Sequence, residues 1–239
     1  MSGHSKWHNI QIRKGKQDAK KANIFTKGAK LITVAAQKGG DPAMNFSLRL
    51  AMDKARAAGL PKENIERALK RGTGELAGAA RMEEIYYEAY GPGGVAILIK
   101  ALTDNKNRTV SDLKHILSVS GGSLGNPGSV AWMFEQVGVI IISKQTTVNR
   151  DELELALIEA GAEDISDTEE EVEIKTKIEN LPKVLAKLKE LNVEVKDSRF
   201  RWIAKDRLEP SPEHEDKLAA LFAELEAHDD VEDYYTNAE

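Results

Sequence analysis

The sequence predicts an α+β protein of three domains. Apolar residues recur at three- and four-residue steps through the N-terminal third, which indicates helices, whereas alternating residues and turn signals begin near Glu84 and indicate strands. Further on, strands and helices are predicted in the β-α-β-β-α-β order of a ferredoxin-like fold. We therefore expect an N-terminal three-helix bundle at residues 1–80, a discontinuous α/β domain at residues 81–137 and 205–239, and an inserted ferredoxin-like domain at residues 138–204.

The first helix is predicted over residues 17–38. One side of it carries an apolar stripe, formed by Ala22, Phe25, Ala29, Ile32 and Ala36. At about 100° per residue, lysines gather on the opposite side, namely Lys16, Lys20, Lys27, Lys30 and Lys38. Many charged helix faces are simply solvated, but such faces generally mix both signs of charge. The absence of acids from this row favours a surface that attracts an anion.

Two more helices complete the predicted bundle. Asp41 is the expected N-cap of the second, with Pro42 as its first residue and Gly59 at its end, and the third runs from Pro61 to about Gly72. Residues expected on the buried faces are Met44, Leu48, Ala51, Met52 and Ala55 in the second helix and Ile65, Ala68 and Leu69 in the third. The outer face of the third helix has two pairs spaced for ion pairing, Glu63–Arg67 and Glu66–Lys70.

The same two helices have the spacing of a helix-turn-helix. Ala55, Gly59 and Ile65 match the small residue, turn glycine and buried branched residue that let two such helices cross. Basic residues would then lie on or beside the second helix of the motif, namely Lys62, Arg67, Lys70 and Arg71. Any helical corner closed by a glycine matches three positions as well, so an ordinary corner is the alternative.

The predicted α/β domain begins with a hairpin. Strands Ile85–Tyr90 and Val95–Leu102 flank a Gly-Pro-Gly-Gly turn, and an amphipathic helix follows. A glycine-rich segment then leads to a short strand at residues 131–134. This domain lacks a closing helix and strand, so we expect the helix after Pro212 and the strand Val231–Tyr235 to complete it.

The inserted domain should contain four strands and two helices. The strands are Val139–Ile142, Glu163–Ser166, Val172–Thr176 and Val193–Ile203, and the helices are Glu152–Ala160 and Pro182–Leu191. RNA-recognition motifs share this order, but they carry base-stacking aromatics on central strands, and the first and third strands here have none. We interpret Phe200 and Trp202 as alternating residues of the last strand that point inward.

Composition excludes several classes of site. The chain of 239 residues has no cysteine, which rules out disulfides and cysteine-ligated zinc or iron–sulfur centres. Its longest apolar runs, Val95–Ile99 and Val139–Ile142, are far shorter than the ~18 residues of a membrane-spanning helix. No apolar segment typical of a secretory signal is visible near the N-terminus. We expect a cytoplasmic protein with no membrane partner.

Charge is separated along the chain. Residues 1–80 hold 16 lysines and arginines against 6 acids, while the remainder holds 18 basic and 33 acidic residues. Such asymmetry predicts that one end of the protein binds a polyanion, of which nucleic acid is the most abundant in cells.

Catalytic and metal-binding patterns are lacking. His4 and His8 have helical i,i+4 spacing, but no third ligand lies near them in sequence. Gly72-Thr73-Gly74 follows a helix rather than a strand, which is wrong for a phosphate-binding loop. No nucleophile elbow is present. We expect no enzymatic activity, no metal and no cofactor.

The first residues combine base, aromatic and hydrogen-bonding side chains. Trp7 can stack on an unpaired base, His4 and His8 can stack or donate hydrogen bonds, and Ser5 can reach sugar or phosphate. The alternative is a tail whose charge is incidental. The tryptophan favours binding, because a merely solubilising tail rarely needs one.

Several long motifs resemble the YebC/PmpR-like family, in order and over essentially the whole chain. They are GHSKW (3–7), QDAKKANIFTK (17–27), GGDP (39–42), LPKENIERALKRGTG (60–74), YEAYGPGGVAILI (87–99), LTDNKNRTVSDLKHIL (102–117) and GSVAWMFE (128–135). Phe46-Ser47 departs from the more basic or proline-containing start of this helix in the family. The resemblance implies three domains and a non-enzymatic regulator of gene expression, since family members include DNA-binding transcriptional regulators and, among mitochondrial and other relatives, ribosome-associated translation factors.

We therefore expect a nucleic-acid partner, either DNA or ribosomal RNA, contacted through the basic N-terminal region. A protein partner on the acidic α/β domains is a further expectation. The predicted nucleic-acid-binding residues are His4, Ser5, Lys6, Trp7, His8, Arg13, Lys14, Lys16, Lys20, Lys21, Lys27, Lys30, Lys62, Arg67, Lys70 and Arg71.

Overall fold

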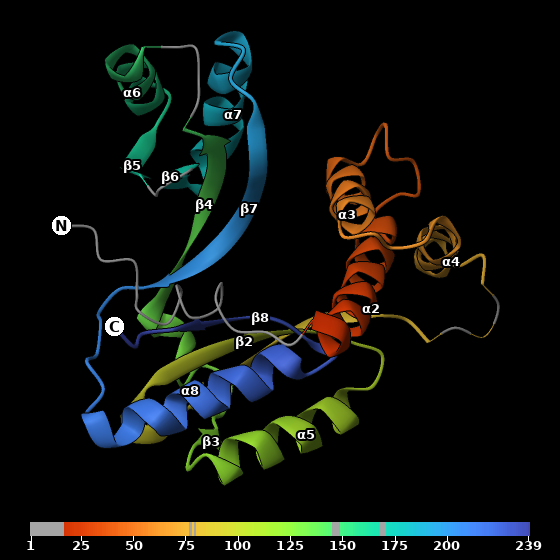
Figure 1. Cartoon of the computed structure of the whole chain (residues 1–239), viewed down its shortest axis with the longest axis vertical. Helices are drawn as coiled ribbons and strands as arrows, with labels where there is room; N and C mark the ends of the chain where they lie inside the picture. Colours follow the sequence, from red (N-terminus) through yellow and green to blue (C-terminus); the bar gives the residue numbers. More distant parts are fainter. Residues whose placement is uncertain (1–16, 77, 79, 145–148, 168–170) are drawn as a thin grey trace. The chain divides into compact units, whose positions relative to one another are not determined.

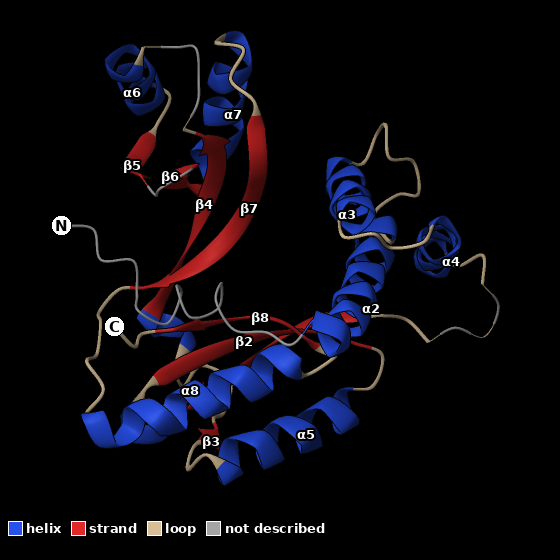
Figure 2. Cartoon of the chain, viewed as in Figure 1, coloured by secondary structure: helices blue, strands red, loops and turns tan. Residues whose placement is uncertain are grey.

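The computed structural model describes residues 17–76, 78, 80–144, 149–167 and 171–239. They form a mixed α/β protein with two four-stranded antiparallel sheets (Figure 2). The chain divides into two compact units: residues 133–206 make one, and the remaining described residues make the other. The predicted α+β class is therefore confirmed, whereas the three-domain layout stays a prediction.

Three helices begin the larger unit, α2 (Gln17–Ala36), α3 (Phe46–Ala57) and α4 (Lys62–Thr73) (Figure 1). Helix α2 packs against both of the others. Their shared core contains Ile32, Ala35, Ala36, Leu48, Met52, Ala55, Leu60, Ile65 and Ala68, with Phe25, Ala29, Ala51 and Leu69 partly buried against it. The helical periodicity read from the sequence thus identifies most of this core.

The start of α3 differs from the prediction. Asn45, not Asp41, is the N-cap, and its side chain accepts a hydrogen bond from the Leu48 N–H. Asp41 instead closes a turn, in which its carboxylate accepts from the Ala43 N–H and its carbonyl from the Asn45 N–H. Met44 consequently lies before the helix and is 87% exposed rather than buried. Asp41 and Asn45 are both suited to cap a helix, and the sequence alone does not show which of the two does so.

Helices α2 and α4 approach closely where Gly72 meets Thr33. A Cβ on Gly72 would overlap the Thr33 carbonyl oxygen and the Ala36 methyl group. Nearby, the buried Thr33 hydroxyl donates within α2 to the Ala29 carbonyl at 2.9 Å and contacts the Ala68 carbonyl of α4 at 3.2 Å. A residue without a side chain therefore sets the separation of the two helices at this point.

The first sheet has the order β3-β1-β2-β8. Its strands are β1 (Glu83–Tyr90), β2 (Ala96–Thr103), β3 (Ser123–Leu124) and β8 (Val231–Thr236). Helices α5 (Lys106–Val119) and α8 (Pro212–Ala227) bury their apolar faces with it in one core, and the short helix η1 (Pro92–Gly94) forms the hairpin turn. Strand β8 pairs with β2, so the C-terminal segment completes this sheet as the sequence predicts.

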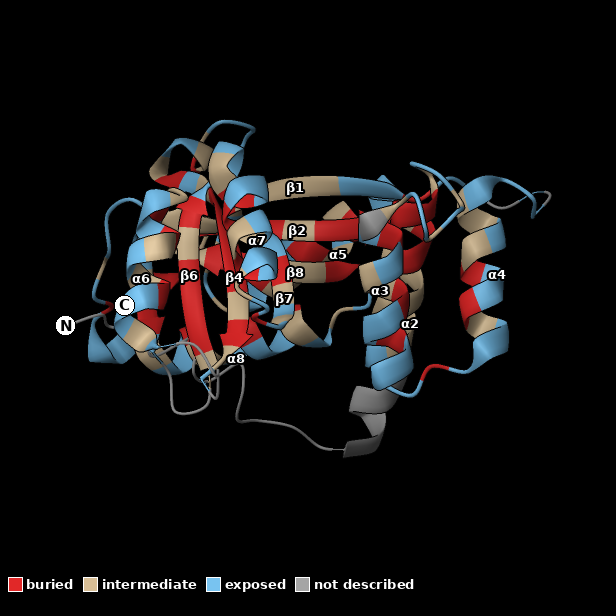
Figure 3. Cartoon of the chain, turned by 90° about the horizontal axis from the view of Figure 1, so that it is seen from above, coloured by how far each residue is buried: buried red, intermediate tan, exposed pale blue. Residues whose placement is uncertain are grey.

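Residues 133–206 form the second unit. Its elements are β4 (Phe134–Ser143), α6 (Arg150–Glu159), β5 (Ala162–Asp167), β6 (Glu171–Lys177), η3 (Ile178–Asn180), α7 (Leu181–Glu190) and β7 (Val195–Ala204). The sheet order β5-β6-β4-β7 is that of a ferredoxin-like fold. Figure 3 shows buried residues along β6 here and along β2 in the other unit.

The two ends of this unit lie side by side. Strand β4 pairs with β7 from Phe134 opposite Ala204, and the Lys205 N–H donates to the Met133 carbonyl at 2.9 Å. The chain therefore enters and leaves the unit through adjacent residues.

Two predictions in this region are wrong. Residues Ala131–Met133 form a 3-10 turn, η2, and the strand begins only at Phe134. Phe200 is 52% exposed instead of inward-facing, and Trp202 is partly buried. Ser198 is the one buried residue of β7, which is an edge strand. Buried and exposed residues therefore do not alternate along it.

We predict opposite effects for two glycine-to-alanine substitutions in the helices. Gly72→Ala should destabilise the protein by ~1–3 kcal/mol, because the new methyl group overpacks the α2–α4 contact. Gly28→Ala should stabilise it by about 0.5–1 kcal/mol, because a Cβ there lies 3.7 Å from the nearest atom, Ala55 Cβ, and alanine favours the helix. Urea unfolding of both variants measures the difference, and equal effects would contradict the close contact.

Candidate nucleic-acid interface

Exposed cations remain on α3 and α4. Those of α4 are Lys62, Arg67 and Lys70, which we call the α4 cations, and those of α3 are Arg49, Lys54 and Arg56. The exposed side of α4 also carries Glu63 and Glu66, and Lys62 Nζ lies 3.7 Å from Glu66 Oε1. Both partners are highly exposed, so this ion pair contributes little and leaves the lysine accessible to phosphate.

The helix-turn-helix positions have the expected environments. Ala55 and Ile65 are buried in the helical core, and Gly59 has a φ of +83°, a conformation that favours glycine. Helix α4 starts two residues after Leu60, with Pro61 as its N-cap. The corner between α3 and α4 is thus formed as the spacing predicts, while groove reading by α4 stays a prediction.

Two predicted lysines on α2 bind within the chain. Lys27 Nζ donates to the Glu226 carbonyl at 2.7 Å, and Asn23 Nδ2 donates to the Ala227 carbonyl at the same distance. These are carbonyls of the last turn of α8, which lack partners inside their own helix and carry the negative end of its dipole. Burial lowers the pKa of Lys27, although acidic residues led by Glu226 oppose the shift.

Lys30, one turn further along α2, reaches a buried carboxylate. Its Nζ lies 2.5 Å from Asp230 Oδ1 and also donates to the Asp229 carbonyl. The expected continuous row of lysines facing solvent is therefore wrong at Lys27 and Lys30, because the α8 terminus and Asp230 supply acceptors for both. Lys38 is exposed, and the side chains of Lys16 and Lys20 lie outside the described residues.

Asp230 is a buried charge with partners on several segments of the larger unit. Its side chain is 3% exposed and accepts hydrogen bonds from Lys30, Arg108 and Thr109, with the Thr103 hydroxyl at 3.4 Å. Burial alone would raise its pKa, but the hydrogen bonds from Lys30, Arg108 and Thr109 outweigh burial and lower the pKa to about 2. The carboxylate therefore joins α2 to α5 and β8.

Arg71 extends this network to α4. Its Nη2 donates to Asp104 Oδ2 at 2.9 Å, and Arg108 Nη2 donates to Asp104 Oδ1 at 3.2 Å. The hydrogen bond from Arg71 is the main cause that lowers the pKa of Asp104. Charges of alternating sign thus run from Arg71 through Asp104 and Arg108 to Asp230. Arg71 is half-buried, unlike the α4 cations.

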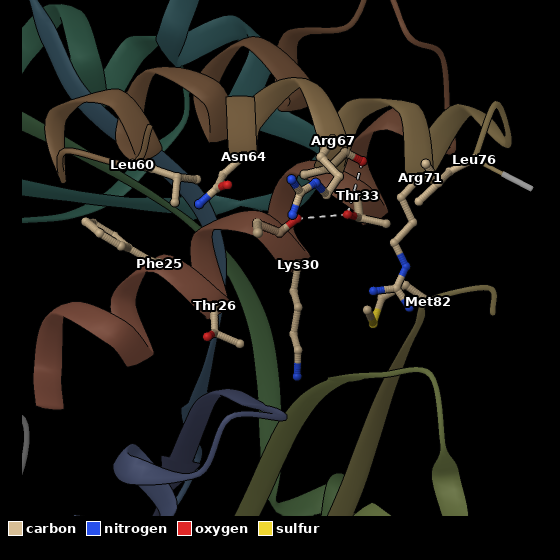
Figure 4. Close-up of a pocket in the computed structure, with 12 residues that line it drawn as sticks. Phe25, Thr26, Lys30, Thr33, Leu60, Asn64, Arg67, Arg71, Leu76 and Met82 are labelled. Atoms are coloured by element: carbon tan, nitrogen blue, oxygen red, sulfur yellow. Dashed lines mark hydrogen bonds between the residues drawn. The ribbon is translucent and has the colours of Figure 1, made fainter. Parts of the chain in front are cut away.

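A cavity of about 460 Å³ lies between α2 and α4 (Figure 4). Its lining includes no acidic residue but three cations, Lys30, Arg67 and Arg71. Apolar walls come from Phe25, Ala29, Leu60, Ala68, Leu76 and Met82, and polar groups come from Thr26, Thr33 and Asn64. The cavity therefore suits a partly apolar anion.

Half of the predicted site lies outside the described residues, namely His4, Ser5, Lys6, Trp7, His8, Arg13, Lys14 and Lys16. Lys20 and Lys21 lie on α2, but the description covers only their backbone. Within the described ranges, no three His, Cys, Asp or Glu side chains are grouped to hold a metal. No described helix is long and apolar enough to cross a membrane.

Sequence reasoning missed the bonds of Asn23 and Asp230 and the place of Asn64 in the cavity lining. Asn23 and Asn64 carry no charge and interrupt no periodic pattern, so they gave no signal. Asp230 lies in the acidic run His228–Asp233, next to the start of β8, where a buried carboxylate cannot be told from a solvated one without its distant partners.

The basic helical region, the antiparallel sheet completed from the C-terminus and the ferredoxin-like unit define a class of mixed α/β proteins with two four-stranded sheets. Family models match most of the chain: residues 5–75 match the TACO1/YebC protein N-terminal domain, and residues 82–238 match the TACO1/YebC second and third domain. The chain belongs to the TACO1/YebC family. The resemblance read from its motifs is thereby confirmed.

Relatives and a solved structure agree with this assignment. Probable transcriptional regulatory proteins of Thermoanaerobacter pseudethanolicus and Thermotoga maritima are 48% and 49% identical to it, over 100% of this chain and 97% and 94% of theirs. The crystal structure of a conserved hypothetical protein from Aquifex aeolicus matches with a TM-score of 0.82 at 39% identity, covering 95% of this chain and 93% of that one.

We predict that Asp230 gives the protein part of its acid sensitivity. Because its pKa is lower in the folded state, its stabilisation is complete above the ordinary pKa of 3.8 and is lost as the pH falls through about 2. The gap in unfolding free energy between the native chain and Asp230→Asn should therefore shrink, on the order of 2 kcal/mol, from pH 5 to pH 2.

Denaturant unfolding at several pH values measures this gap. Asp53→Asn is the matched control, because Asp53 forms an exposed ion pair with Arg56, and such pairs contribute only ~0–1 kcal/mol. A gap for Asp230→Asn that stays constant with pH would show that Lys30 and Arg108 do not hold this carboxylate in solution.

Proposed function

We propose that this protein is a non-enzymatic regulator of gene expression that binds nucleic acid through its basic N-terminal region, as a DNA-binding transcriptional regulator. The observation that carries the proposal is the charge asymmetry, with 16 basic residues against 6 acidic ones in residues 1–80 and a net negative remainder. Phosphate attraction of this kind supplies most non-specific affinity for nucleic acid. The names of the relatives support a role in transcription.

The proposed contacts combine the α4 cations with the residues from His4 to Lys16. Lys62, Arg67 and Lys70 are exposed and free to reach phosphate or a base edge. Lys27 and Lys30 are not part of this surface, since their ammonium groups already have acceptors within the chain. Arg71 is likewise engaged by Asp104.

A second candidate is a ribosome-associated translation factor that contacts ribosomal RNA through the same region. One observation favours it: the exposed side of α4 mixes Glu63 and Glu66 with its three cations, which is unfavourable for a helix lying in a DNA groove. The closeness of Trp7 to His4 and His8 in the sequence also suits unpaired bases better than a regular duplex.

Replacing the α4 cations should reduce the salt dependence of binding. If Lys62, Arg67 and Lys70 each neutralise one phosphate, the triple Gln variant should make the slope of log K against log salt less negative by about 2.7 on duplex DNA and about 2 on single strands. Fluorescence anisotropy with labelled duplex DNA and structured RNA over a salt series measures the slopes.

The matched control removes three exposed lysines from the other unit, Lys177, Lys183 and Lys189, and so changes the net charge equally. It should leave the slopes almost unchanged. A selected duplex sequence whose preference depends on the α4 cations would support the DNA function and defeat the ribosomal one. An equal effect of the two triple variants would remove α4 from the interface.

The substitution Trp7→Ala should affect binding to RNA and to duplex DNA differently. Loss of one base–aromatic stack should weaken binding to structured or single-stranded RNA by ~1–3 kcal/mol. Duplex DNA should respond much less, because its bases are already stacked on one another. Quenching of the indole emission, compared with Trp7→Phe, reports the contact directly. Equal binding by Trp7→Ala and the native chain to both polymers would show that this residue takes no part.

A further inference from the structure

We propose that the cavity between α2 and α4 is a binding site for a single unstacked nucleotide. The volume of about 460 Å³ falls in the ~300–1,000 Å³ range of small-molecule sites. Its lining combines an aromatic ring, an amide and a guanidinium, in Phe25, Asn64 and Arg67. These three groups correspond to the three parts of nucleotide recognition: stacking, a base edge and a phosphate. The proposal deepens the proposed function, on which it rests.

The apolar end of the cavity is built by both helices. Phe25 on α2 lines it from one side, and Leu60, just before α4, and Asn64, on α4, line it from the other (Figure 4). Ala29 and Ala68, both small, line the same space and leave room between the helices. Apolar side chains beside a phenyl ring suit the face of a base that has left a stacked strand.

Polar groups in the cavity have unused hydrogen-bonding capacity. The Asn64 amide and the Arg67 guanidinium form no side-chain hydrogen bond with any described residue, and Arg71 Nε is buried without an acceptor among them. Lys30 points away from this end toward Asp230 (Figure 4). An amide offers a donor and an acceptor side by side, which suits the edge of a base, whereas Arg67 suits its phosphate.

The electrostatic character of the cavity also fits this ligand. Three cations and no acid line it, although the chain as a whole is acidic with a net charge of −5. A neutral apolar ligand would leave the Arg67 guanidinium without an anion, since Lys30 and Arg71 are already bonded to Asp230 and Asp104, and a bare inorganic anion would leave the half-buried Phe25 ring without an apolar contact. A nucleotide matches both parts of the lining, either free or as a flipped residue of a bound strand.

Titration calorimetry on the full chain with AMP, adenosine, inorganic phosphate and the tetranucleotide rA4 tests the proposal. AMP should bind more tightly than adenosine or phosphate, and Asn64→Leu and Phe25→Leu should each weaken AMP by roughly tenfold. Arg67→Gln should weaken the binding of AMP while leaving the affinity for adenosine unchanged. Lys189→Gln is the control, because it removes an exposed cation from α7 that neither lines the cavity nor belongs to the proposed nucleic-acid surface, and it should change AMP affinity less than twofold.

Comparing the affinities of rA4 and AMP shows whether the nucleotide is free or part of a strand. Tighter binding of rA4 than of AMP, beyond the fourfold statistical factor, would identify a residue of a strand, and equal binding a free nucleotide. No saturable binding of AMP or rA4, or equal losses in Arg67→Gln and Lys189→Gln, would overturn the proposal. If the salt slopes of the α4 triple variant still change in that case, the proposed function stands without the cavity. Thermal unfolding by circular dichroism confirms that each variant is folded.

Discussion

The larger unit depends on one buried carboxylate. Asp230 lies at the start of β8, and its partners come from α2 and α5, so three segments distant in sequence share a single charge. Removing Lys30 or Arg108 would take away one of the two cations that compensate a nearly solvent-free charge, which is more destabilising than the loss of a surface pair. The bonds from Asn23 and Lys27 to the end of α8 act beside it and fix the same face of α2. The basic helices are therefore held to an acidic partner within their own chain.

This arrangement divides the cations of the N-terminal region into two sets. Lys27, Lys30 and Arg71 satisfy acceptors inside the protein, whereas Lys62, Arg67 and Lys70 face solvent. The net charge of the sequence does not distinguish the two sets, because each lysine or arginine contributes equally to it. Only the second set has the freedom to release counterions from a polyanion.

Local pattern predicted the helices, the hairpin and the ferredoxin-like order, because each depends on periodicity or on turn residues within a short stretch. The errors occur where two local signals compete or where a distant partner decides. Asp41 and Asn45 are both suitable caps, and only the packed helix selects Asn45. Phe200 alternates correctly but lies on an edge strand, β7, where burial depends on what covers it. Lys30 was expected in solvent because Asp230 is 200 residues away. Phe25 and Asn64 likewise become neighbours only through the packing of α2 on α4.

The ferredoxin-like unit has a topological consequence for the chain that contains it. Because Phe134 is paired with Ala204 and Met133 with Lys205, the folded insertion holds its two ends together. The first sheet requires β8 to lie beside β2. The connection between its two chain segments is therefore as short as the distance between the paired ends of the insertion, rather than an open loop of the full inserted length. Closure entropy grows only slowly with loop length, by about 0.6 kcal/mol per doubling, and a folded insertion removes even that dependence. The insertion can consequently vary in length or sequence without disturbing the rest of the fold, because only the adjacent ends of β4 and β7 connect it to the other unit.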